Sequence, residues 1–60
     1  MNLPKDPIIL LSYINTQLRD NYASLSEFTI SLGADEEDIK SRLEKAGYIY
    51  DEETNRFIRK

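Results

Sequence analysis

Residues 24–50, SLSEFTISLGADEEDIKSRLEKAGYIY, decide the fold because they hold two helix starts and two glycine stops. Ser24 and Glu27 form a capping-box pattern, in which each side chain accepts a hydrogen bond from a free backbone N–H at the helix start. Gly33 follows the last apolar position and is typical of a left-handed residue just after a helix. The pattern predicts a helix over about residues 25–32.

A further helix is predicted over residues 36–46, with Asp35 as its N-cap and Gly47 as its stop. The inward positions of the two helices are apolar, with Thr29 beside them: Leu25, Phe28, Leu32, Ile39, Leu43 and Ala46.

After Gly47 the spacing changes to that of a β-hairpin, with short runs at residues 48–50 and 56–58. If Tyr50 faces Phe57, alternation places these two side chains on one face together with Tyr48. The aromatic face carries more apolar area and is expected to pack on the helices. Ile49 and Ile58 then occupy the outer face.

The N-terminal part predicts a helix from Pro7 to about residue 20 or 21, capped by Asp6. Its predicted core stripe, with Leu10 on the flank, is Ile8, Leu11, Ile14, Leu18 and Tyr22. The predicted core of the whole chain is Leu11, Ile14, Leu18, Leu25, Phe28, Leu32, Ile39, Leu43 and Tyr48. The expected fold is α+β: one small winged-helix-like domain over residues 1–60, a three-helix bundle with a helix-turn-helix and a C-terminal two-stranded hairpin.

Composition narrows the function classes. The chain of 60 residues has no cysteine or histidine and a formal net charge of −3, which removes disulfides and ordinary zinc or haem ligation. The longest apolar run is far shorter than the ~20 residues of a membrane span. We read no secretion signal and expect a cytoplasmic protein without membrane, small-molecule or cofactor binding.

Residues 25–58 resemble winged-helix regulators in their spacing, which implies that the helix after the turn reads DNA. The opening segment MNLPKDPIILLSYINTQLRD and the closing segment GYIYDEETNRF more narrowly resemble a family of small bacterial proteins catalogued only as a domain of unknown function. That second resemblance implies no activity.

Apolar residues off the core stripe form the candidate protein-interaction surface: Ile9, Tyr13, Ile49 and Ile58. Two interpretations stay open. These residues contact a protein partner or a second copy, or the hairpin folds back over the first helix and buries Ile9 or Tyr13.

Nucleic-acid contact is the competing hypothesis, with candidate residues Lys45, Arg56, Arg59 and Lys60. The helix at residues 36–46 argues against it, because Glu37 and Glu44 flank its outward position Ser41 and would face a polyanion. The acidic run 35–38 is expected to complement the helix dipole and to form i,i+4 pairs, Glu36 with Lys40 and Asp38 with Arg42.

No motif for catalysis or metal binding is recognised. The carboxylates of Asp51, Glu52 and Glu53 lack the spacing of a calcium loop, and no nucleophile has a recognisable base beside it. The chain is therefore expected not to be an enzyme. The leading hypothesis is a non-catalytic protein-interaction module, which can self-associate; the alternative is a small winged-helix DNA-binding regulator.

Overall fold

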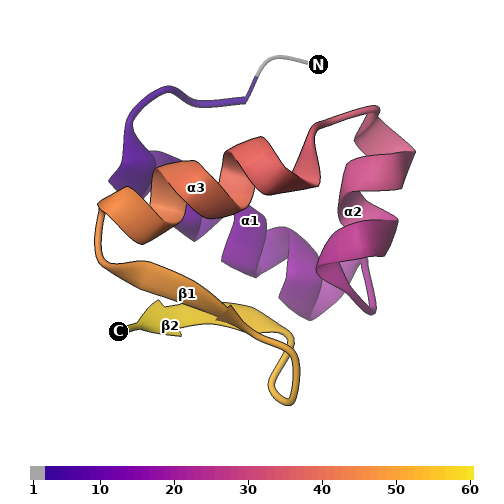
Figure 1. Cartoon of the computed structure of the whole chain (residues 1–60). Helices are drawn as coiled ribbons and strands as arrows, with labels where there is room; N and C mark the ends of the chain where they lie inside the picture. The colour runs from indigo at the N-terminus through magenta and orange to yellow at the C-terminus, as the bar shows by residue number, and fades with distance from the viewer. Residues whose placement is uncertain (1–2) are drawn as a thin grey trace.

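A computed structural model describes residues 3–60 and contains three helices followed by a two-stranded antiparallel hairpin (Figure 1). The elements are α1 (Pro7–Asp20), α2 (Leu25–Leu32), α3 (Glu36–Lys45), β1 (Tyr48–Asp51) and β2 (Arg56–Arg59). The α+β fold class expected from the sequence is confirmed. No helix within the described range is long and apolar enough to cross a membrane.

Each helix has the N-cap residue that the sequence predicts. Asp6 accepts from the backbone N–H groups of Ile8 and Ile9, Ser24 from that of Glu27, and Asp35 from two N–H groups of α3. The Glu27 carboxylate reaches back to the N–H of Ala23 at 3.0 Å, which completes the predicted capping box.

Both glycines have the positive φ that their positions predict, 68° at Gly33 and 96° at Gly47. The third helix ends at Lys45, one residue earlier than expected, and Ala46 forms its C-cap. These turns set the directions of α3 and of the hairpin.

One core joins all three helices and the hairpin. Its buried apolar residues are Leu10, Ile14, Leu18, Leu25, Phe28, Ile39, Leu43 and Phe57. Thr29, expected beside the core, is itself buried and donates its hydroxyl to the Ser26 carbonyl. Leu11, Leu32 and Tyr48, which were predicted inside, are half-buried and pack against this cluster.

The predicted stripe of α1 is wrong in its phase. Ile8 is 56% exposed, whereas Leu10 is completely buried. The true stripe is Leu10, Ile14 and Leu18, spaced four residues apart, and it is rotated about 60° from the predicted one at ~100° per residue. Residues 8–11 are all apolar, so this turn alone does not distinguish the two phases.

The hairpin has the predicted register, with Tyr50 opposite Phe57 and Ile49 opposite Ile58. Phe57 points into the core and Tyr50 packs on it, with ring centres 5.5 Å apart. Strand β2 lies along α1 and strand β1 along α3, so the hairpin closes one side of the helical layer (Figure 1).

Candidate functional site

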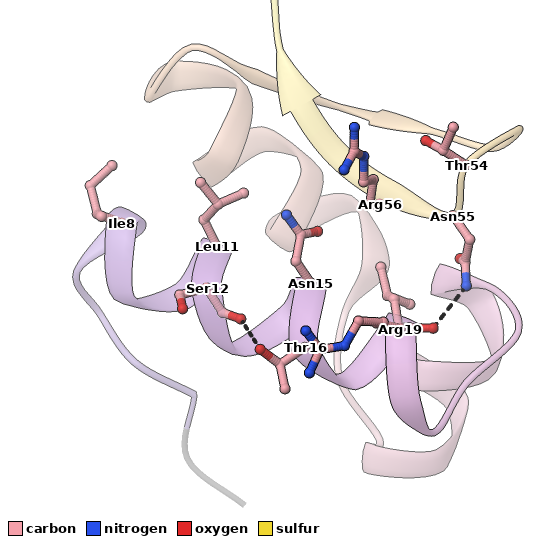
Figure 2. Close-up of a pocket in the computed structure, with 10 residues that line it drawn as sticks. Ile8, Leu11, Ser12, Asn15, Thr16, Arg19, Thr54, Asn55 and Arg56 are labelled. Carbon is pink, nitrogen blue, oxygen red and sulfur yellow. Dashed lines mark hydrogen bonds between the residues drawn. The ribbon is translucent and has the colours of Figure 1, made fainter.

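An open groove of about 870 Å³ lies between α1 and the hairpin (Figure 2). We call it the α1–β2 groove. One side follows α1 and the other is made by the hairpin turn and the start of β2. Its lining residues are Ile8, Leu11, Ser12, Asn15, Thr16, Leu18, Arg19, Thr54, Asn55 and Arg56.

Asn15 joins the two sides of the groove at its middle. Its Oδ1 accepts from the backbone N–H of Phe57 at 2.8 Å, and its Nδ2 donates to the Phe57 carbonyl at 3.1 Å. The side-chain amide thus occupies the open edge of β2 as a neighbouring strand would. It satisfies two backbone groups that would otherwise be left unpaired at an edge.

Asn55 joins the two sides again at the end of α1. It has φ 53°, a conformation that Asn tolerates better than most residues. Its Nδ2 donates to the carbonyls of Leu18 and Tyr22, and its Oδ1 accepts from the Tyr50 hydroxyl at 2.7 Å. That hydroxyl also accepts from the N–H of Leu25. The turn, the end of α1 and the start of α2 therefore form one hydrogen-bonded unit.

The groove is apolar at one end and basic at the other. Ile8 and Leu11 lie near the start of α1, and Arg19 and Arg56 lie toward its end (Figure 2). Arg19 forms two hydrogen bonds with Asp20, at 2.9 and 3.0 Å, and these lower the pKa of the Asp20 carboxyl. Arg56 has no ion-pair partner within residues 3–60. The lining can bind an anion or a peptide through guanidinium, amide and hydroxyl groups.

The predicted interaction surface is divided between two places, neither of them in the groove. Tyr13 packs edge-on against Phe28 of α2, with ring centres 6.3 Å apart, while Ile9 is 59% exposed. Ile49 and Ile58 face each other across the outer side of the hairpin. Helix α2, rather than the hairpin, thus supplies the aromatic ring that contacts Tyr13.

The four predicted nucleic-acid contacts do not form one patch. Lys45 and Lys60 line a smaller hollow of about 440 Å³ on α3, and Lys60 lies 3.6 Å from the Glu44 carboxylate. Arg56 lies in the α1–β2 groove, and Arg59 is exposed at the end of β2.

The outward face of α3 is of mixed charge. The smaller hollow holds Glu37, Lys40, Ser41 and Glu44 besides the two lysines just described. At the start of α3, the expected pairs are present: Glu36 with Lys40 at 3.0 Å, and Asp38 with Arg42 at 3.8 Å. Within residues 3–60, no three carboxylates are grouped so that they could hold a metal ion.

Most of the groove was missed by reasoning from sequence. Among its residues the sequence indicates only Arg56 as a candidate contact, and for nucleic acid. The available signal was a face of α1 with polar or basic residues at positions 12, 15, 16 and 19, which recur at helical spacing. That signal does not reveal which other element lies beside the face.

Comparison with known proteins finds no match among curated proteins or solved structures, so the winged-helix resemblance remains a loose likeness of element order. The resemblance of the two terminal segments to a family of unknown function is confirmed, and the match covers almost the whole chain. The family described as "Domain of unknown function (DUF4250)" matches residues 4–57, and the chain belongs to this family.

Proposed function

We propose that the protein is a non-catalytic, cytoplasmic protein-interaction module that contacts its partner through the α1–β2 groove. The observation that carries the proposal is the groove itself, a hollow with the exposed Ile8 and the half-buried Leu11 at one end and, toward the other, Arg56, which has no ion-pair partner within residues 3–60. An exposed Ile8 costs solvation free energy that a partner would recover by covering it.

The rigid attachment of the hairpin to α1 favours the binding of a partner in the groove. Asn15 and Asn55 hold the hairpin against α1 through four hydrogen bonds to backbone groups, so little conformational entropy remains to be lost when a partner binds. The groove is open, and its two threonine hydroxyls bond within the protein: Thr16 donates to the Ser12 carbonyl and Thr54 to the Asp51 carboxylate of the hairpin turn. This arrangement is suited to recognition rather than to activation of a nucleophile.

The test uses two double variants that are matched in chemistry and differ only in location. Ile8→Ser with Arg56→Ala alters the groove, whereas Ile30→Ser with Arg59→Ala makes the same changes outside it. All four side chains are exposed, so both variants are expected to fold, which circular dichroism checks.

Each variant is immobilised and exposed to lysate of cells that make the protein naturally. The proposal predicts a partner that the wild type and the outer variant retain and that the groove variant loses. Equal capture by both variants would contradict it. If the partner is a second copy, sedimentation of the purified wild type shows a dimer that the groove variant lacks.

The alternative function, a winged-helix DNA-binding regulator, is supported by the order of elements alone. The charges oppose it: α3 presents Glu37 and Glu44, and the hairpin tip carries Glu52 and Glu53. We expect no binding of random duplex DNA at micromolar protein and ~150 mM salt, where weak phosphate contacts are screened. Fluorescence anisotropy across a salt series checks this. Salt-dependent micromolar binding that Arg56→Ala weakens would favour the regulator.

A further inference from the structure

The groove differs in charge from the rest of the chain. The protein has 11 acidic and 8 basic residues, yet the ten residues that line the groove include two arginines and no carboxylate. Since Asp20 pairs with Arg19, Arg56 is the groove cation without a carboxylate partner in the described chain.

The residue opposite Arg56 in the hairpin is a carboxylate that bonds to the turn and forms no ion pair with Arg56 within residues 3–60. Asp51 lies opposite Arg56 in the hairpin register, but its carboxylate accepts from the N–H of Glu53 at 3.1 Å and from the Thr54 hydroxyl at 2.8 Å. These bonds stabilise the turn. The Arg56 guanidinium is therefore left able to form a two-point contact with a carboxylate from outside.

The length of the groove limits what fits. From Ile8 to Arg19 the wall follows eleven steps of α1, about 16 Å at ~1.5 Å per residue. An extended peptide rises ~3.3 Å per residue, so about five residues span this wall. Its apolar side chains would cover Ile8 and Leu11 at one end while an acidic side chain reaches Arg56 at the other.

We propose that the partner of the α1–β2 groove is a short protein segment with an apolar residue and, a few positions away, an aspartate or glutamate that pairs with Arg56. This inference rests on the proposed function and names the class of its ligand. A nucleic acid is the less favoured occupant, because one arginine without a carboxylate partner neutralises few phosphates. The apolar end of the groove has no charged group that could bind a phosphate.

The test is selection of binding peptides from a random ten-residue display library. The purified wild type is compared with Arg56→Glu and with Arg59→Glu, a matched charge reversal on the same strand outside the groove. The wild type and Arg59→Glu are expected to enrich peptides that combine Asp or Glu with Leu, Ile or Phe. Arg56→Glu is expected to bind these peptides about tenfold more weakly, since attraction becomes repulsion, and to enrich lysine and arginine instead.

The outcomes separate this inference from the proposed function. Two results would overturn the acidic class and leave the groove as a binding site. One is a set of peptides that need Ile8 but are not enriched in Asp or Glu; the other is the same peptide charge selected by the wild type and by Arg56→Glu. Absence of any peptide that is sensitive to Ile8→Ser or Arg56→Glu would overturn both. Binding of a labelled single-stranded or duplex nucleic acid that is lost in Arg56→Glu and kept in Arg59→Glu would overturn the protein partner.

Discussion

Replacing Asn15 with alanine is expected to destabilise the protein substantially, although the side chain is neither apolar nor in the core. Alanine removes the acceptor for the Phe57 N–H and the donor for the Phe57 carbonyl. Both backbone groups lie on the edge of β2 that faces α1 and are half-buried there. The hairpin would then lose its polar attachment at the middle of the groove.

The size of the effect follows from the two bonds. A neutral hydrogen bond contributes about 0.5–1.5 kcal/mol net, so two contribute about 1–3 kcal/mol. At about 0.05–0.15 kcal/mol per residue, a chain of this length has a total stability of about 3–9 kcal/mol. The loss is thus a large fraction of the whole. With a urea m-value of about 1 kcal/mol/M for a small protein, the midpoint should fall by about 1–3 M.

Urea unfolding followed by circular dichroism measures this change. Thr16→Ala is the control, because Thr16 is the next residue on α1 and its hydroxyl donates only to the Ser12 carbonyl within the helix. Its effect should stay within about 0.5 kcal/mol. If Asn15→Ala unfolds at the same urea concentration as Thr16→Ala, the attachment of the hairpin through Asn15 is not what holds the groove together.

Three further substitutions test other parts of the fold. Leu43→Ala should cost about 2–5 kcal/mol, because Leu43 is completely buried; a loss below about 1 kcal/mol in urea melts would contradict its central place in the core. Gly33→Ala should cost about 1 kcal/mol in the same melts: nothing lies within 4 Å of the added Cβ, so the cost comes from the positive φ alone, and a neutral result would refute that origin. Hydrogen bonds from Lys40 and Ser26 lower the pKa of Glu36 below its ordinary 4.5, so this carboxylate stabilises the fold above that pH and ceases to do so as the pH falls through the lowered value. Thermal melts from about pH 6 to pH 3 should therefore show a smaller loss for Glu36→Gln than for the wild type, and equal losses would contradict this contribution.

The helix ends are predictable from sequence because they depend on interactions between residues close together in the chain. Asp6, Ser24 and Asp35 each satisfy helix N–H groups within three residues, and the two glycines act through their own φ. Such features depend on neighbours in sequence and can be read from it. The phase of α1 cannot be read in this way, because its first turn is apolar all round. Packing against α2, α3 and Phe57 decides whether Ile8 or Leu10 is buried.

The groove depends on contacts between residues distant in sequence. Asn15 meets Phe57 across 42 positions, and Asn55 meets Leu18 across 37. An asparagine on a helix is unremarkable by propensity, and its pairing with a strand edge exists only once the hairpin lies along α1. The same holds for Arg56, whose place in the groove along α1 rather than over α3 follows from the direction in which the hairpin folds.

Site-specific photo-cross-linking tests the central claim, that the α1–β2 groove is the contact surface, most directly. A benzophenone amino acid is placed at Thr16 inside the groove or at Ile30 of α2, which does not line it, both exposed. Each protein is then irradiated in lysate of cells that produce it naturally. We predict a discrete cross-linked partner from position 16 that is absent from position 30. Cross-links of equal yield from both positions, or from position 30 alone, would contradict the claim.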